Sequence, residues 1–285
     1  MTMQQTPLLM HRLMDRGAML QPEVEVQTAT ETGVRSQTML ETRNRAHQLA
    51  HALNDAGVQT GDRVATFMWN GARHLECYHA IACMGAVVHT LNIRLSPVDL
   101  EYIITHAQDK IIVVDADILP LLEKLEGKMP SVEKIVVAAE PGFENWSTSL
   151  PNAVDYEEFI KDKPTRYEWP EIDENSPMGL CYTSGTTGKP KGVMYTHRAN
   201  YLHTISIAMT DVMGLSATDT LLGIVPLFHA NAWGLPWVAT MLGMKQVYPH
   251  RFMVPDHLAR LIRDCDVTIS AGVPTIWQGI KGLME

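Results

Sequence analysis

The stretch TSGTTGKPKG, residues 183–192, lies between two apolar runs, MGLCYT at 178–183 and GVMYTH at 192–197. Both runs have the length and residue types of strands, so the stretch is predicted to connect one strand to the next. Its glycines permit positive φ, so consecutive backbone N–H groups can form an anion-binding nest. Side-chain donors are supplied by Thr183, Ser184, Thr186, Thr187, Lys189 and Lys191, and the glycines are Gly185, Gly188 and Gly192. A loop that holds phosphate is the interpretation that uses all of these features.

Two well-known motifs do not fit this stretch. A Walker A loop needs glycine five residues before Gly188 and Ser or Thr after Lys189, where this chain has Thr183 and Pro190. A nucleophile elbow, G-x-S-x-G, is excluded because neither residue two positions from Ser184 is glycine. A flexible hairpin loop without a ligand remains the alternative.

Composition argues against several classes of protein. The 285 residues include 23 Lys and Arg against 32 Asp and Glu, a formal charge of −9, which argues against binding of duplex nucleic acid over a broad basic face. The four cysteines form no CxxC pair, so buried free thiols in a reducing compartment are expected. The N-terminal residues lack the continuous apolar run of a signal peptide, and a cytoplasmic location is the simplest interpretation.

Residues 220–244 contain no Asp, Glu, Lys or Arg and are long enough to span a bilayer. Pro226 and Pro236, together with three glycines, are predicted to break this segment into a strand, a polar turn and a short helix. No transmembrane segment is therefore predicted.

The remaining pattern alternates helical and extended segments, which is typical of an α/β fold with mainly parallel sheets flanked by helices. A helix start is marked by Ser96-Pro97-Val98-Asp99, with an N-cap serine and a proline in the first turn. The proline-rich, charged residues 161–177 suggest a connection, with a boundary near residue 171 between a first lobe, 1–171, and a second lobe, 172–285. Further strands are predicted at 63–68, 86–92, 110–117, 134–139, 220–225, 245–249 and 267–271, and helices at 41–56, 73–85, 118–128, 198–213 and 256–265.

The eleven residues from Tyr182 to Gly192 resemble the phosphate-loop signature of the adenylate-forming (AMP-binding) superfamily, which includes acyl-CoA synthetases, luciferases and peptide-synthetase adenylation domains. Similar segments occur along the chain at 73–97, 106–115, 196–200, 225–236 and 271–279. Together they resemble the medium- and long-chain fatty acyl-CoA synthetase branch. The resemblance implies the large N-terminal domain of that fold.

Enzymes of this superfamily join a carboxylate to ATP, release pyrophosphate, and then transfer the acyl group from AMP to the thiol of coenzyme A. The resemblance implies that Lys191 contacts phosphate and that Lys189 stays solvated. It also implies that Thr183 helps to ligate Mg²⁺, a hard cation that prefers oxygen ligands. The residues expected to bind the phosphates of ATP are Thr183, Ser184, Gly185, Thr186, Thr187, Gly188 and Lys191.

The segment VPLFHANAWGLP, residues 225–236, is the second site that the resemblance implies. His229 and Ala230 are expected to line the adenylate, and Trp233 the mouth of an acyl tunnel. Amino-acid-activating relatives place an aspartate after the phenylalanine of this segment, whereas here His229 follows Phe228. A substrate without an ammonium group is therefore favoured.

The family's later motifs, including a Tyr-Gly-x-Thr-Glu segment and a C-terminal domain with a catalytic lysine, do not occur before Glu285. The chain is therefore interpreted as the N-terminal part of an ATP-dependent fatty acid–CoA ligase, incomplete and inactive alone. One alternative is a short nucleotide- or acyl-binding protein without catalysis. Another is a ligase for aryl or short-chain acids. A homodimer is expected from family analogy alone.

Overall fold

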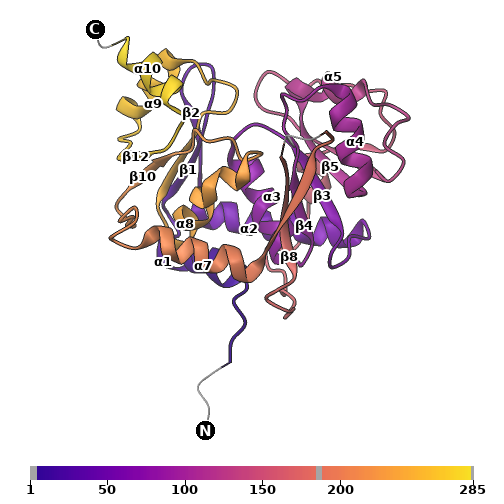
Figure 1. The fold of residues 1–285 in the computed structure, drawn as a ribbon, viewed down its shortest axis with the longest axis horizontal. Helices are drawn as coiled ribbons and strands as arrows, with labels where there is room; N and C mark the ends of the chain where they lie inside the picture. Colours follow the sequence, from indigo (N-terminus) through magenta and orange to yellow (C-terminus); the bar gives the residue numbers. More distant parts are fainter. Residues whose placement is uncertain (1–4, 184–187, 284–285) are drawn as a thin grey trace.

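The computed structural model describes residues 5–183 and 188–283, which form two β-sheets with helices between and around them (Figure 1). Within this part the larger sheet has seven strands in the order β7-β6-β5-β3-β4-β8-β9. Every neighbouring pair is parallel except β8 and β9, as the alternating sequence pattern predicts. The strands are β3 (Arg63–Phe67), β4 (Val87–Thr90), β5 (Asp109–Asp115), β6 (Lys134–Ala138), β7 (Ala153–Asp155), β8 (Pro177–Thr183) and β9 (Lys191–Thr196).

The smaller sheet has five strands within the described residues, in the order β12-β10-β11-β1-β2. Strands β1 and β2 form an antiparallel hairpin, and β1 joins the sheet by pairing in parallel with β11. This hairpin is not among the strands predicted from sequence. The strands are β1 (Glu25–Ala29), β2 (Val34–Thr38), β10 (Thr220–Leu222), β11 (Lys245–Tyr248) and β12 (Ile269–Ser270).

Helix α3 (Ala72–Cys83) lies between the two sheets, and all twelve of its residues are buried. A helix that is buried on every side must pack between two layers, and α3 accordingly contacts strands of both sheets. Figure 1 shows α2 and α8 between the sheets with α3, and α4 and α5 on the opposite side of the larger sheet. The other helices are α1 (His11–Leu20), α2 (Met39–Asp55), α4 (Pro97–Ala107), α5 (Leu119–Glu123), α6 (Tyr156–Ile160), α7 (His197–Ala208), α8 (Leu235–Leu242), α9 (Pro255–Asp264) and α10 (Pro274–Lys281), with short turns η1 (Ala116–Ile118) and η2 (Ala230–Gly234).

Two local predictions are confirmed. The Ser96 hydroxyl accepts a hydrogen bond from the backbone N–H of Asp99, and α4 begins at Pro97. The charge-free residues 220–244 form β10, the η2 turn and α8. No described helix combines the length and apolar character needed to cross a bilayer.

The predicted boundary near residue 171 does not coincide with a division between the sheets. Residues 161–176 contain no helix or strand, as their proline-rich composition predicts. Strands β8 and β9, which follow them, nevertheless complete the larger sheet, and the β1–β2 hairpin completes the smaller one. Each sheet therefore takes strands from both 1–171 and 172–285, because long-range pairing is not encoded in local composition.

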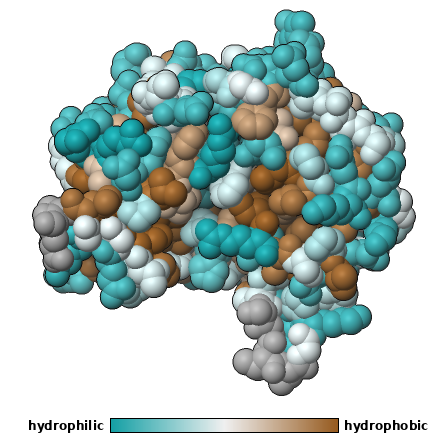
Figure 2. Space-filling model, turned by 90° about the horizontal axis from the view of Figure 1, so that it is seen from above, coloured by the Kyte–Doolittle hydropathy of each residue, from teal (hydrophilic) through white to brown (hydrophobic). Residues whose placement is uncertain are grey.

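The surface seen from above is polar along much of its margin, and apolar side chains are exposed towards its middle (Figure 2).

The buried apolar clusters follow the layers formed by the two sheets and their helices. The largest buried cluster fills the space between the sheets, and smaller clusters cover the outer face of each sheet. The inner layer carries most of the apolar burial that stabilises the fold.

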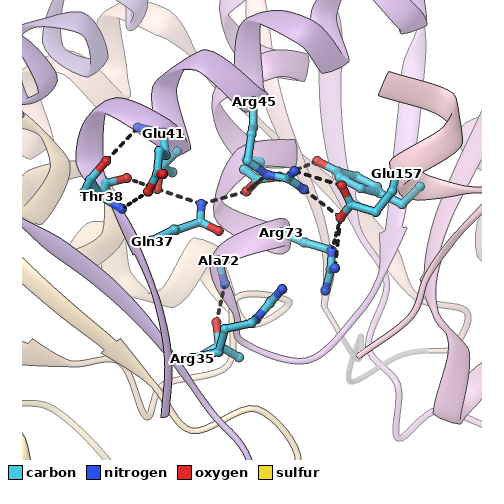
Figure 3. A network of polar contacts seen from close by, with 12 residues as sticks. Arg35, Gln37, Thr38, Glu41, Arg45, Ala72, Arg73 and Glu157 are labelled. Atoms are coloured by element: carbon cyan, nitrogen blue, oxygen red, sulfur yellow. Dashed lines mark hydrogen bonds and ion pairs between the residues drawn. The ribbon is translucent and has the colours of Figure 1, made fainter. Parts of the chain in front are cut away.

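A network of ion pairs ties α6 to the helices of the inner layer (Figure 3). Glu157 accepts hydrogen bonds from two Arg45 nitrogens at 2.8 and 2.9 Å and from Arg73 Nε at 2.9 Å. Glu76 is fully buried and accepts from Arg45 Nε at 2.8 Å and from the Tyr156 hydroxyl at 2.7 Å. Partial burial raises the pKa of Glu157, but the two guanidinium groups outweigh it and lower this pKa to about 2.

We expect Glu157→Gln to reduce stability at neutral pH by about 1 kcal/mol, because the carboxylate is 46% exposed and solvent screens its ion pairs. The folded-state pKa is depressed, so the wild-type contribution is complete above pH 5 or so and is lost as pH falls towards about 2. Urea denaturation between pH 2 and 7 measures this slope. The matched control is Glu158→Gln, because Glu158 is the exposed neighbour of Glu157. Equal acid slopes in wild type and Glu157→Gln would contradict the assignment.

Candidate functional site

The predicted strand-to-strand position of the phosphate loop is confirmed. Strands β8 and β9 are antiparallel, with Tyr182 opposite Gly192 and Thr183 opposite Lys191. Thr183, Gly188 and Lys191 are all exposed. The predicted phosphate-binding residues Ser184, Gly185, Thr186 and Thr187 lie outside the described residues.

A first cavity, here called the loop cavity, adjoins the described ends of this connection and has a volume of about 320 Å³. It brings together four of the residues predicted from sequence, Thr183, Gly188, His229 and Ala230. Gly188 has φ +133°, a value that favours glycine and agrees with the predicted positive φ. The other lining residues are Asn92, Leu95, Asp99, Ile103, Cys181, Tyr182, Pro190 and Tyr195.

A second cavity, here called the Trp233 cavity, has a volume of about 480 Å³. It shares Tyr195 and Ala230 with the loop cavity, so the two cavities meet at these residues. Trp233 is 43% exposed and lines only the second of them. Lys191 is not among the lining residues of either cavity. The remaining residues of the Trp233 cavity are Ala199, Asn200, His203, Asn231 and Gly234.

The chain passes from one cavity to the other through a left-handed turn. Ala230, Asn231, Ala232 and Trp233 have φ values of 44°, 50°, 50° and 56°. For residues other than glycine this conformation costs roughly 1–2 kcal/mol each relative to the right-handed form. A run of four strained residues persists only where the surrounding structure holds it, and such runs are typical of functional sites.

Buried side chains hold this turn in place. Asn231 is 3% exposed, and its Oδ1 accepts a hydrogen bond from Cys181 Sγ at 3.2 Å. The Tyr78 hydroxyl donates to the Leu227 carbonyl at 2.5 Å. A side chain at Gly179 would place its Cβ 3.0 Å from Asn231 Nδ2, so glycine leaves the space that the amide fills. These contacts offset the backbone strain.

Sequence reasoning missed Asn70, which positions the segment before the turn. Its Nδ2 donates to the carbonyls of Gly223 and Val225, each at 2.8 Å, and its Oδ1 accepts from the N–H of Leu227 at 2.9 Å. In sequence, Asn70-Gly71 is typical of a turn, and nothing local indicates these distant partners. The role of Tyr78 was missed for the same reason.

All four cysteines are free and buried, as that part of the prediction states. Cys181 lies where β8 faces the left-handed turn, and burial raises the pKa of its thiol. The thiol therefore stays protonated at neutral pH and acts as a hydrogen-bond donor to Asn231. Its environment is that of a structural thiol and not of a nucleophile.

Lys189 is exposed, as expected for a solvated lysine, and it also contacts an aromatic ring. Its Nζ lies 4.7 Å from the centroid of the Tyr102 ring, which belongs to α4. This distance is within the range of a cation–π interaction.

In the described part of the chain, no group of three His, Cys, Asp or Glu side chains gathers to hold a metal.

Comparison with protein families matches residues 14–284 to AMP-binding enzymes, and the chain belongs to this family. It is 44% identical over 236 residues to the medium-chain-fatty-acid–CoA ligase of Ectopseudomonas oleovorans, a match that covers 83% of this chain and 43% of the relative. It is 40% identical over 287 residues to the long-chain-fatty-acid–CoA ligase of Thermus thermophilus, covering 100% of this chain and 51% of the relative. The chain thus spans about half the length of the curated relatives it matches.

Solved structures share the fold. The anthranilate CoA ligase AuaEII in complex with anthranoyl-AMP aligns with a TM-score of 0.83 at 24% identity, over 97% of this chain and 51% of that one. A long-chain-fatty-acid-CoA ligase from Archaeoglobus fulgidus aligns with a TM-score of 0.82 at 23% identity, over 97% and 54%. At these identities the likeness shows the fold alone, and it confirms the predicted fold class.

We expect Ala232→Gly to reduce stability far less than Ala46→Gly. Both alanines are buried, at 3% and 1% exposure, and both substitutions lose one buried methyl group. Ala46 lies inside α2, where glycine costs about 1 kcal/mol, whereas at the left-handed Ala232 glycine relieves about 1–2 kcal/mol of strain. Free energies of unfolding from urea titrations check the difference. Equal losses would show that the turn at Ala232 is not left-handed in solution.

Proposed function

We propose that the chain forms the nucleotide- and acid-binding part of an ATP-dependent fatty acid–CoA ligase. The observation that carries this proposal is the meeting of the loop cavity and the Trp233 cavity at Tyr195 and Ala230. Joining a carboxylate to a nucleotide requires two bound molecules whose reacting atoms are held together and in line. Membership of the AMP-binding enzyme family, and relatives named as medium- and long-chain fatty acid–CoA ligases, support the same reaction.

The proposed reaction has two steps. In the first, a carboxylate oxygen of the acid attacks the α-phosphorus of ATP, the bond to the bridging oxygen breaks, and pyrophosphate leaves. In the second, the thiol of coenzyme A loses its proton and attacks the acyl carbon, and AMP leaves. Charge grows on the leaving pyrophosphate in the first step, so donors fixed around the phosphates accelerate it.

The phosphate loop supplies these donors in the proposal. Thr183 and Lys191 would contact the β- and γ-phosphates, together with the backbone N–H groups and hydroxyls of residues 184–188. The exposed Thr183 hydroxyl and the positive φ of Gly188 fit this role. A bound Mg²⁺ neutralises phosphate charge. Thr183 is the residue that we propose would hold it, because a hydroxyl oxygen is a ligand type that this hard cation accepts.

The acid would lie across the left-handed turn. We propose that His229 and Ala230 line the adenylate in the loop cavity and that Trp233 borders the acyl chain in the second cavity. His229 in place of an acidic residue favours an acid without an ammonium group. The four free cysteines support a reducing compartment, which we take to be the cytoplasm. A homodimer is proposed by family analogy, and no role for nucleic acid is proposed.

We expect Thr183→Ala and Lys191→Ala each to slow ATP–pyrophosphate exchange by about ten- to a hundredfold, because each removes a charge-assisted contact to phosphate. The measurement uses the complete product of the gene that encodes this chain. Lys161→Ala removes an exposed lysine far from the loop and is the matched control. Wild-type exchange rates in both loop variants would overturn the assignment.

The same assay, run with short, medium, long-chain and aryl acids, tests the class of substrate. Exchange that is fastest with medium or long-chain fatty acids supports the proposal. A preference for aryl or short-chain acids would overturn the fatty acid assignment and leave an adenylate-forming ligase. ATP binding without exchange for any acid would instead indicate a binding protein without catalysis.

We expect Trp233→Ala to raise KM for the fatty acid about fivefold or more while KM for ATP stays within about twofold. Trp233 lines only one of the two cavities, so losing its apolar surface weakens contact with the acid alone. Steady-state kinetics with each substrate varied in turn separate the two constants. A parallel rise in both would place Trp233 at the nucleotide.

A further inference from the structure

Helix α4 presents two aromatic side chains, Tyr102 and His106, beside the phosphate loop. They lie four residues apart, which places them on the same face of the helix. Their ring centroids are 5.3 Å apart, so the two rings contact each other. Tyr102 is half-buried and His106 is exposed. The pair lies outside the predicted site residues.

Each of these side chains contacts one end of the loop. The Tyr182 hydroxyl and His106 Nδ1 are hydrogen-bonded at 2.6 Å, and Tyr182 directly precedes Thr183. Lys189 directly follows Gly188, and its ammonium lies 4.7 Å from the Tyr102 ring centroid. One face of one helix therefore contacts the residue before Thr183 and the residue after Gly188.

The Tyr182 ring also contacts a second histidine. His89, on β4, lies with its ring centroid 5.2 Å from that of Tyr182. The His89 ring is itself fixed, because its Nδ1 is 2.8 and 2.9 Å from the two carboxylate oxygens of Asp109, and both residues are fully buried. Burial raises the pKa of Tyr182 to about 12, so its hydroxyl stays protonated at neutral pH while it shares the hydrogen bond with His106 Nδ1.

We propose that Tyr102 and His106 are positioning residues that hold the two ends of the phosphate loop on α4 and thereby increase its affinity for ATP. This inference rests on the proposed function of the loop. Binding a triphosphate with a loop orders the chain, and anchored ends reduce the conformational entropy that binding must remove. Neither residue needs to touch the nucleotide in this role.

The test is a set of variants in the complete gene product, with ATP affinity measured by isothermal titration calorimetry. We expect Tyr102→Leu to weaken ATP binding about two- to fivefold and Tyr102→Phe to restore affinity to within twofold of wild type, since phenylalanine keeps the aromatic face. Tyr182→Phe, which loses only the hydroxyl bonded to His106, is expected to weaken binding about two- to tenfold.

A double-mutant cycle separates the contact from the charge of Lys189. Lys189→Met alone removes both the charge and the contact with Tyr102. In the Lys189→Met background, Tyr102→Leu is expected to have no further effect on ATP affinity. Lys161→Met is the control for loss of an exposed lysine. Melting temperatures identify any unfolded variant. If Tyr102→Leu does not fold, Tyr182→Phe carries the test, because it removes a single oxygen atom.

The outcomes distinguish this inference from the proposed function. Weaker ATP binding by Thr183→Ala together with wild-type affinity of Tyr102→Leu and Tyr182→Phe would overturn the role of α4 alone. Tighter ATP binding by Tyr102→Leu would also overturn it, since Tyr102 would then compete with phosphate for Lys189. Wild-type ATP affinity of Thr183→Ala would overturn the proposed function of the loop itself.

Discussion

The three hydrogen bonds of the Asn70 side chain join the two sheets, and the position of the second half of the candidate site depends on them. Asn70 follows β3 of the larger sheet, while its partners, Gly223, Val225 and Leu227, follow β10 of the smaller one. The amide is 5% exposed, so removing it would leave two carbonyls and one N–H unpaired, at about 1–3 kcal/mol each. These bonds fix the position of residues 223–227, and so of the turn that follows them beside β8.

The left-handed turn follows the segment that Asn70 fixes. Within a few residues of Leu227 the chain must line one cavity with His229 and another with Trp233. The Cys181 thiol on β8 donates a hydrogen bond to the Asn231 amide oxygen at 3.2 Å, so a strand of the larger sheet holds the turn. The strain of four left-handed residues is thus offset by buried contacts that exist only when both sheets are assembled. Formation of the site and packing of the sheets are therefore coupled.

The parts of this fold that sequence predicted are those governed by local chemistry. Apolar runs predicted most strands of the larger sheet, Ser96 marked the start of α4, and the Gly- and Thr-rich stretch at 183–192 was placed between two strands. Pairing between distant segments was not predictable, because the β1–β2 hairpin joins β11 over more than two hundred residues with no local signal. Likewise, family resemblance is what predicted His229 and Trp233 as site residues, whereas Asn70 and Tyr102 contact partners that only the folded chain brings near.

Each sheet supplies one side of the candidate site. Thr183 ends β8 of the larger sheet and Gly188 lies in the connection from β8 to β9, whereas residues 223–234 follow β10 of the smaller sheet. The two cavities meet at Tyr195, which is on β9, and Ala230, which is in the turn. In the proposed function, the distance between two reactants would therefore be set by how the sheets pack across α3. Close-packed protein interiors resist deformation. The inner layer that stabilises the fold therefore also fixes the geometry in which the two reactants would meet.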